Sequence, residues 1–370
     1  MKRKTWLLAA GGAVGLAALV AGIAYAAGLR PGAAGLRPGE AGLRPGEAGA
    51  EPTAVSEHLS AVQAAILGVV EGLTEYLPVS STGHLILVNH AMGLSHFTDP
   101  AHPLRSGIEK VPAVDAFDIV IQLGAILAVL GLYRKRVGQM VLGLAGRDPA
   151  GLRLTVSLLI AFLPAAVVGV ALHGWIKEHL FNPVSVIAAL AVGGVLMIVV
   201  EHYFGRRRRD APPFDHAQGG PRSTQGLSTG SMVERPRVTD VVQMRYWQAL
   251  VIGLAQVLAM WPGTSRSMIT ILAALVIGFD MLAAAEFSFL LALPTLGAAT
   301  VYEGAKSWHD LTGSVGVDGM LIGLVVSGVV AALAVKGFVR WLTRHGLMPF
   351  GLYRLGLAAA VFGYFMWSAR

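Results

Sequence analysis

The stretch that decides the fold runs Glu71-Gly72-Leu73-Thr74-Glu75-Tyr76-Leu77-Pro78-Val79-Ser80-Ser81-Thr82-Gly83-His84. It carries two carboxylates, three consecutive hydroxyls and an imidazole between the apolar runs 61–70 and 85–88. A charged side chain at membrane depth costs roughly 2.5–3.5 kcal/mol on insertion scales, so polar groups placed there mark a functional site. The stretch therefore predicts a site within a membrane.

The same residues predict a broken helix. Glu71 and Glu75 are four positions apart, so both point to one face of a helix. Pro78 lacks a backbone donor and disfavours helix at the residue before it. The helix should end there, and residues 80–83 should form a turn. One of the first two serines of that turn should cap a second helix, which carries His84.

The composition indicates a polytopic, all-α membrane protein. The chain has 370 residues, of which 54% are hydrophobic and 14% charged, and its mean hydropathy is +0.62. The net charge of +7 comes from basic clusters between apolar runs, so it indicates topology rather than a nucleic-acid partner. Cysteine is absent, which excludes disulfides, thiolate catalysis and Cys-ligated metals.

An extra apolar segment precedes the repeats. Residues 1–27 have a basic start and a long apolar run, which fits either an uncleaved anchor or a signal peptide with a small-residue cleavage site at 24–26. The sequence Gly-Leu-Arg-Pro-Gly then occurs three times at seven-residue spacing within residues 28–58. Glycine and proline at this density cannot build a core, so this segment is predicted to be a linker.

Six further apolar runs are long enough, or nearly so, to span a bilayer. They are residues 117–133, 154–172, 184–200, 282–301, 320–335 and 353–367. The basic runs between them are predicted to be cytoplasmic, because Lys and Arg concentrate on that side. Those runs are residues 134–153, 206–209 and 336–344.

This arrangement leaves two hairpins that do not span. Residues 59–92 should enter and leave from the outer side, and residues 245–278 from the cytoplasmic side. The predicted domains are a first repeat (59–204), a cytoplasmic loop (205–244) and a second repeat (245–370). Gln63-Ala-Ala-Ile-Leu-Gly also resembles Gln248-Ala-Leu-Val-Ile-Gly. Such a pattern is typical of an inverted-topology repeat, whose broken helices build a site near the midplane.

The second hairpin turn reads Pro262-Gly263-Thr264-Ser265-Arg266-Ser267. Arg266 has a planar fork of donors that suits phosphate oxygens. Gly263 allows backbone amides to approach a ligand, and a helix starting near Ser265 would point its first amides at an anion.

Together the two turns predict a site for a phosphate ester or anhydride. Arg266 would hold the charge, Glu71 and Glu75 would hold a hard divalent cation, Mg²⁺ or Ca²⁺, and a hydroxyl or His84 would attack phosphorus. The carboxylates could instead be structural partners of Arg266, and the hydroxyls could be helix caps. Glu286 could serve either packing or the site.

Two long motifs carry a family resemblance. Residues 71–84 and 262–267 resemble the signature motifs of the bacterial undecaprenyl-diphosphate phosphatases of the bacitracin-resistance type. Residues 117–124, 286–294 and 349–354 are also similar to that family. The resemblance covers about residues 59–368, and it does not extend to residues 1–57 or explain the long loop 210–239.

The resemblance implies an enzyme of the bacterial plasma (inner) membrane that removes one phosphate from undecaprenyl diphosphate. This reaction returns the lipid carrier for peptidoglycan synthesis and confers bacitracin resistance. A polyprenyl diphosphate lipid and the bilayer are then its partners, its site opens to the external side, and Mg²⁺ or Ca²⁺ is required. The resemblance leaves the oligomeric state open, a homo-oligomer included.

The implied roles follow the motif positions. Glu71 and Glu75 would be metal or acid–base residues, and Arg266 would be the phosphate clamp. Ser81 would be the nucleophile, with His84 as proton carrier or alternative nucleophile, and direct attack by water stays open. The remaining site residues would line the pocket: Ser80, Thr82, Ser265 and Ser267. Met268 departs from the small residue that is frequent there and would narrow the pocket.

A transporter or lipid flippase is the competing hypothesis, because inverted repeats and broken helices also build transport sites. A carboxylate pair could serve as a proton or sodium relay. A relay needs no nucleophile beside a phosphate clamp, however, so the Ser-Ser-Thr-Gly-His turn combined with Arg266 favours hydrolysis. A pure transporter would release no phosphate.

Overall fold

The computed structural model describes residues 59–97, 107–110, 112–209, 214–215, 220–221, 238–306 and 316–368. The predicted anchor or signal (1–27) and the predicted linker (28–58) lie outside the described residues, as does most of the loop 205–244.

The described fold is mostly helical. Its α-helices are α2 (Ala61–Thr74), α3 (Ser81–Ala91), α4 (Pro112–Leu132), α5 (Arg134–Leu144), α6 (Pro149–Leu180), α7 (Pro183–Arg209), α8 (Tyr246–Gln256), α9 (Arg266–Val276), α10 (Met281–Lys306), α12 (Val317–Leu342) and α13 (Met348–Ser368). Short 3₁₀ turns occupy Val241–Gln243 (η1) and Val257–Met260 (η2). Two small antiparallel ribbons were not expected: β1 (Ser95–Phe97) pairs with β2 (Ile108–Lys110), and β3 (Phe214–Asp215) with β4 (Gly220–Pro221).

Five described helices are long and apolar enough to cross a membrane. The candidate spans are Val114–Leu132, Pro149–Ile176, Pro183–Tyr203, Met281–Ala305 and Val317–Leu342. The sixth expected span lies in α13, which has 21 residues but carries Arg354 within its apolar run, and it falls outside the five. The helices of the two hairpins, α2, α3, α8 and α9, have 11 to 14 residues, which is too short to span.

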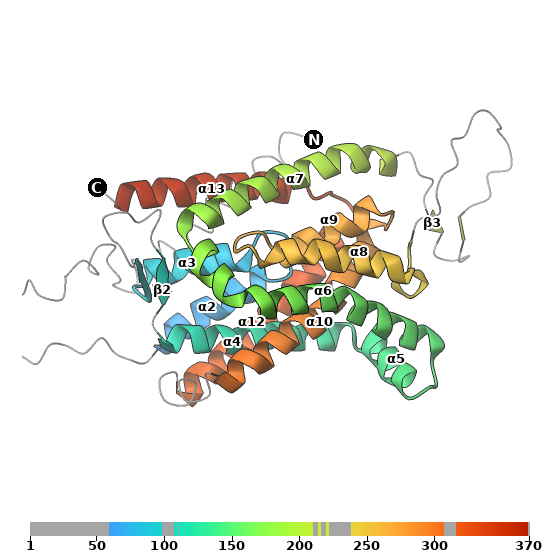
Figure 1. Cartoon of the computed structure of the whole chain (residues 1–370), viewed down its shortest axis with the longest axis horizontal. Helices are drawn as coiled ribbons and strands as arrows, with labels where there is room; N and C mark the ends of the chain where they lie inside the picture. Colours follow the sequence, from blue (N-terminus) through green and yellow to red (C-terminus); the bar gives the residue numbers. More distant parts are fainter. Residues whose placement is uncertain are drawn as a thin grey trace, which may run out of the picture.

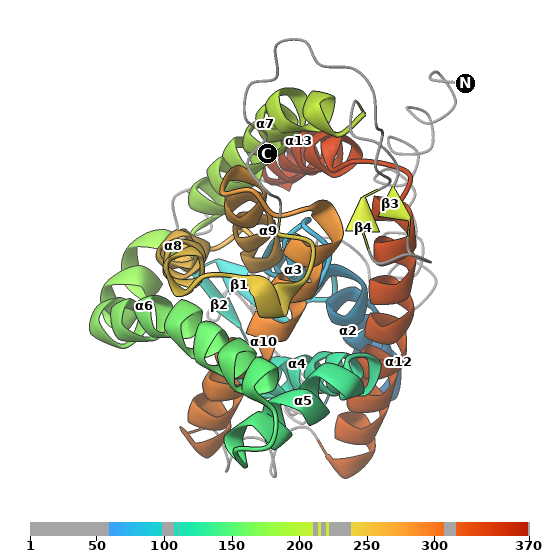
Figure 2. The ribbon, with the colours of Figure 1, turned by 90° about the vertical axis from the view of Figure 1, so that its right-hand side faces the viewer.

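The long helices run side by side along the longest axis of the molecule (Figure 1). The β1–β2 ribbon lies at one end, and α5 and β3 lie at the other. Helix α7 packs along α13, α12 packs against α2 and α4, and α6 packs against α5 and α8. The end-on view shows α10 among these helices, with α7 and α13 at one edge and α12 along another (Figure 2).

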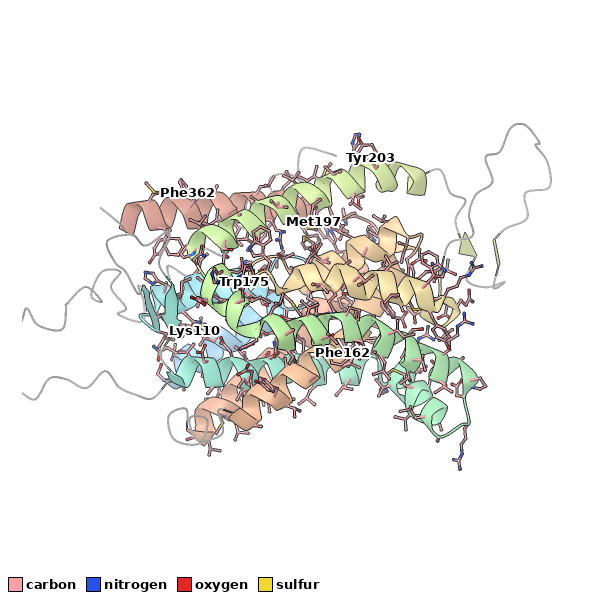
Figure 3. The ribbon with its side chains drawn as sticks, viewed as in Figure 1. Lys110, Phe162, Trp175, Met197, Tyr203 and Phe362 are labelled. Atoms are coloured by element: carbon pink, nitrogen blue, oxygen red, sulfur yellow. The ribbon has the colours of Figure 1, made fainter. Side chains whose placement is uncertain are left out.

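Side chains divide between a packed interior and an apolar exterior. Tyr203 and Phe362 project outward and are 68% and 49% exposed, whereas Met197, on the same helix as Tyr203, is fully buried (Figure 3). Because the outer faces of the spanning helices are apolar, they suit contact with lipid rather than water.

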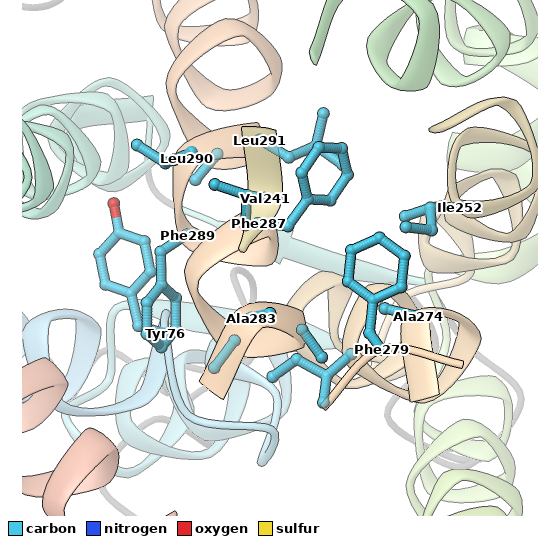
Figure 4. Packing of buried hydrophobic residues seen from close by; sticks show 14 of the residues in the cluster. Tyr76, Val241, Ile252, Ala274, Phe279, Ala283, Phe287, Phe289, Leu290 and Leu291 are labelled. Carbon is cyan, nitrogen blue, oxygen red and sulfur yellow. The ribbon is translucent and has the colours of Figure 1, made fainter. Parts of the chain in front are cut away.

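The aromatic core surrounds α10, next to the first hairpin turn (Figure 4). Phe289 meets the ring of Tyr76 edge-on at 5.6 Å and the ring of Phe338 at 6.1 Å. The Tyr76 hydroxyl donates to the Ala125 carbonyl at 3.0 Å. These contacts fix the turn that follows α2 against α4, α10 and α12.

Candidate active site

The first turn has the predicted cap. Helix α2 ends at Thr74, earlier than Pro78 alone predicts, and residues 75–79 form turns. Ser80 is the N-cap of α3, and its Oγ accepts a hydrogen bond from the Gly83 amide at 3.3 Å. The backbone of Ser80 has a φ of 75°, in the left-handed half of conformational space.

The second turn repeats this geometry. Helix α8 ends at Gln256, and α9 begins at Arg266, close to the start predicted near Ser265. Ser265 is the N-cap of α9. The Ser265 Oγ accepts from the Met268 amide at 3.3 Å, and its φ is 72°. Among the residues that the structure describes, Ser80 and Ser265 are the two non-glycine residues with positive φ.

Helices α2 and α8 also begin alike. The Gln63 side chain accepts from the Ser60 amide at 2.9 Å, and the Gln248 side chain accepts from the Arg245 amide at 2.8 Å. Each glutamine is the third residue of its helix, and its side chain is hydrogen-bonded to the backbone amide of the residue that precedes the helix. These are the two glutamines that begin the segments found similar in the sequence.

Hydrogen bonds join the two turns directly. The Ser267 Oγ donates to the Leu77 carbonyl at 3.0 Å, and it lies 3.1 Å from the Ser265 Oγ. Ser267 is fully buried, so this contact between the hairpins is shielded from solvent.

Arg354 of α13 holds the same two turns from another side. Its guanidinium donates to the carbonyls of Gly263 at 2.8 Å and Pro78 at 3.5 Å, and to those of Ala189 and Leu190 at 3.0 and 3.3 Å. Arg354 is fully buried. This role was not predicted, because residues 353–367 read as a plain apolar run. An arginine inside such a run is itself a signal of a buried functional or structural role.

A chain of polar contacts crosses between the turns. The Ser81 hydroxyl donates to Glu75 Oε2 at 2.7 Å, and Arg266 Nη2 donates to Glu75 Oε1 at 3.3 Å. Arg266 Nη1 donates to the Ser288 carbonyl at 2.9 Å, and the guanidinium carbon lies 5.9 Å from the centre of the Tyr76 ring. The structure thus brings a hydroxyl, a carboxylate and a guanidinium together, as predicted. It also shows that Glu75 is a partner of Arg266.

Two buried atoms at this site lack partners. Glu71 is 3% exposed, and neither its Oε2 nor the Nε of Arg266 has a hydrogen-bond partner among the described residues. Glu71 interacts electrostatically with Glu75, Asp118, Lys110 and Arg266. A buried acceptor and a buried charged donor without partners are costly. Their presence favours a polar ligand at this site.

The remaining predicted residues lie around the start of α3. Thr82 is half-buried beside Ser81. His84 is 4% exposed, and its ring nitrogens are engaged by groups other than Ser81: Nδ1 lies 2.7 Å from the Ser80 carbonyl, and Nε2 lies 2.6 Å from the Tyr353 hydroxyl. Tyr353 lies in the stretch 349–354 that resembles the family, but no local pattern marks it as a partner of His84.

Two other polar groups make their hydrogen bonds outside this chain of contacts. Glu286, left open by the sequence, accepts from Arg136 Nε at 2.7 Å, and Arg136 also binds Asp240 at 2.8 Å. Gln256, at the position that corresponds to Glu71, is buried and accepts from Thr295 at 3.5 Å.

Lys110 binds carboxylates at the start of α4, at distances of 2.5 Å from Asp118 and 3.3 Å from Asp115. Burial works to lower the pKa of Lys110, but these two carboxylates outweigh it and raise that pKa above its ordinary value.

Residues 64–360 match the family model described as bacitracin resistance protein BacA. The chain belongs to this family. A BacA-family relative from Sorangium cellulosum (strain So ce56), named undecaprenyl-diphosphatase, is 48% identical over 299 residues, which cover 80% of this chain and 84% of the relative.

Two more relatives of the BacA family match over nearly their whole length. An undecaprenyl-diphosphatase from Rhizorhabdus wittichii is 40% identical over 306 residues, covering 82% of this chain and 97% of that protein. Undecaprenyl-diphosphatase 2 from Rhodospirillum rubrum is 42% identical over 314 residues, covering 83% of this chain and 98% of that protein.

Proposed function

We propose that this BacA-family protein is an integral membrane phosphatase that hydrolyses undecaprenyl diphosphate to undecaprenyl phosphate and inorganic phosphate. The observation that carries the proposal is the chain from Ser81 through Glu75 to Arg266, which joins a hydroxyl, a carboxylate and a phosphate-binding guanidinium from two turns. The names of the relatives support the choice of substrate.

The geometry supports Ser81 as the nucleophile. Its oxygen would attack the terminal phosphorus and form a phosphoserine, while the bond to the departing lipid phosphate breaks and the hydroxyl proton passes to Glu75. Arg266, whose Nε has no described partner, would bind the phosphate oxygens and stabilise their growing charge. Water would then hydrolyse the phosphoserine.

Glu71 is the residue best placed to hold a cation. Its buried Oε2 lacks a partner, whereas both oxygens of Glu75 are engaged. No group of three or more acidic or histidine side chains suited to a metal occurs within the described residues. Mg²⁺ or Ca²⁺ would then be held by one or two carboxylates together with substrate phosphate. Such an ion would neutralise phosphate charge.

We also propose that the fold is an inverted repeat with two re-entrant hairpins. The short first helix of each half packs against a long helix of the other half: α2 against α12, and α8 against α6. The paired glutamines and the paired positive-φ serines support the same correspondence. The first hairpin would enter from the external side of the bacterial inner membrane, where the substrate would reach Ser81.

In this position the enzyme would return the lipid carrier to peptidoglycan synthesis. It would also confer bacitracin resistance. The family name supports this physiological role.

The test is phosphate release from undecaprenyl diphosphate by purified protein in detergent, with Mg²⁺, with Ca²⁺ and with a chelator. We expect release that depends on the divalent ion and falls at least a hundredfold in Glu75→Gln, Ser81→Ala and Arg266→Ala, since each removes one member of the contact chain.

Glu286→Gln is the matched control, because Glu286 also pairs with an arginine but lies outside the two turns. It should keep activity within a few fold. If folded wild-type protein released no phosphate, the proposal would fail, and lipid movement across liposomes would become the reaction to measure.

A further inference from the structure

The partners of the His84 ring define its protonation. Nδ1 lies 2.7 Å from the carbonyl oxygen of Ser80. A carbonyl oxygen can only accept, so Nδ1 must carry the hydrogen of this bond. The carbonyl belongs to the residue with a φ of 75°, and this backbone conformation places it beside the ring.

The other ring nitrogen then has a defined role. Nε2 lies 2.6 Å from the Tyr353 hydroxyl. In a neutral ring with hydrogen on Nδ1, Nε2 is an acceptor, so Tyr353 donates to it. His84 is 4% exposed, and its hydrogen-bond partners in the described part of the chain are a carbonyl and a hydroxyl. With no carboxylate bonded to it there, a buried imidazolium would be costly.

Tyr353 is itself held in place. Its ring stacks on His84 with centroids 5.7 Å apart and an angle of 11° between the planes. The next residue, Arg354, binds four backbone carbonyls and so anchors α13 to both hairpin turns. Helix α13 therefore brings one fixed hydroxyl to the ring.

We propose that Tyr353 is a positioning residue that holds His84 as the neutral tautomer with hydrogen on Nδ1 and keeps Nε2 turned away from Ser81. Ser81 already donates to Glu75, so the two potential bases are separated: Glu75 faces the nucleophile and His84 faces Tyr353. The kinetic half of the test rests on the proposed phosphatase activity, and the spectroscopic half does not.

The spectroscopic test uses protein with ¹⁵N-labelled histidine in detergent. His84→Gln identifies the His84 signals by difference among the 11 histidines. We expect a protonated Nδ1 and an unprotonated Nε2 in the wild type. In Tyr353→Phe, which keeps the stacked ring, the Nε2 signal should shift and the two tautomers should begin to exchange.

The kinetic test is a double-mutant cycle. Tyr353→Phe should lower kcat about tenfold, roughly the effect of one lost hydrogen bond, with KM unchanged within about twofold. In the His84→Gln background the same substitution should have no further effect, because Tyr353 acts through His84.

Tyr364→Phe is the matched control, since Tyr364 lies on the same helix with its ring against that of His90, 5.9 Å between centroids. It should change neither the His84 signals nor kcat. A wild-type ring protonated on Nε2, or additive effects of Tyr353→Phe and His84→Gln, would overturn the proposal. The wild-type tautomer is read with His84→Gln as the only reference, so it does not depend on the folding of Tyr353→Phe. An inactive wild type would refute the phosphatase without altering this readout.

Discussion

Ser80 and Ser265 have the same unusual backbone and perform the same task. A non-glycine residue with positive φ costs of order 1–3 kcal/mol and persists where its surroundings require it. Glycine would remove that cost, but it has no oxygen with which to cap the following helix. The serine at each position therefore combines the turn with a cap that orients the first amides of α3 and α9.

Ser265 allows the two contributions to be separated. Ser265→Ala should lower the free energy of unfolding by about 1 kcal/mol, because the cap is lost and the backbone cost stays. Ser265→Gly should lower the free energy of unfolding by less, because glycine removes the cost of the positive φ and this offsets part of the lost cap. Thermal unfolding in detergent measures both. Equal destabilisation by alanine and glycine would contradict this explanation.

The sequence predicted the local roles of the site residues but not their long-range contacts. The serines after Pro78 indicated a cap, and the position of Arg266 after Pro-Gly indicated a ligand, because local chemistry decides both. The cap formed by Ser265 was not predicted. The Tyr353–His84 and Arg354 contacts join residues separated by up to 276 positions, and no local pattern specifies them. That the Nε2 of His84 meets Tyr353 depends on α13 and could not be predicted from the motif alone.

At the scale of elements, glycines set the distance between helices. A Cβ at Gly124 of α4 would clash with the Leu324 carbonyl oxygen on α12. A Cβ at Gly72 of α2 would lie 2.5 Å from the Ser327 carbonyl oxygen, which is also on α12. Small residues at such positions allow two backbones to approach closely in a membrane. Helix α12 therefore lies directly on both α2 and α4.

The α4–α12 contact predicts a difference between two glycines of one helix. Gly124→Ala should lower the free energy of unfolding by about 1–3 kcal/mol, because backbone must move to make room. Gly131→Ala, whose new methyl would meet no atom within 4 Å, should be neutral or slightly stabilising. Denaturation of both variants in the same detergent checks this, and equal stability would show that α12 is not held at this distance.

Element boundaries were harder to predict than element existence. Pro78 places the break after α2 correctly, but the helix already ends at Thr74, because Glu75 begins the turn that faces Ser81 and Arg266. The ribbon formed by β1 and β2 was not predicted, since its strands have three residues each and lack an alternating pattern.

At the scale of the whole molecule, the two halves share geometry and divide chemistry. From Gln63 to Ser80, and from Gln248 to Ser265, the spacing is the same 17 positions (80 − 63 and 265 − 248). With that spacing, Glu71 corresponds to Gln256 and Ser81 to Arg266. Neither half holds both the carboxylates and the guanidinium, so the site is complete only where the halves meet.

The proposed topology places the two ends of α6 on opposite sides of the membrane. The chain has no cysteine, so a single substitution introduces the sole thiol. Glu178→Cys, at an exposed position near the end of α6, should react with a membrane-impermeant maleimide in intact spheroplasts. Arg147→Cys, exposed just before α6, should react only after the membrane is opened. Labelling in the reverse order would invert the topology.

The Glu75–Arg266 pair also constrains how the protein is made, because 191 positions separate its two residues. At roughly 5–20 residues per second, a ribosome needs about 10–40 s to reach the arginine after it has made the glutamate. In the proposed topology, the nascent first hairpin enters the membrane during that interval with Glu71 and Glu75 but without Arg266. The Glu75–Arg266 contact can therefore form only after α9 is made. A product that stops before Arg266 would leave Glu75 without the guanidinium that binds it.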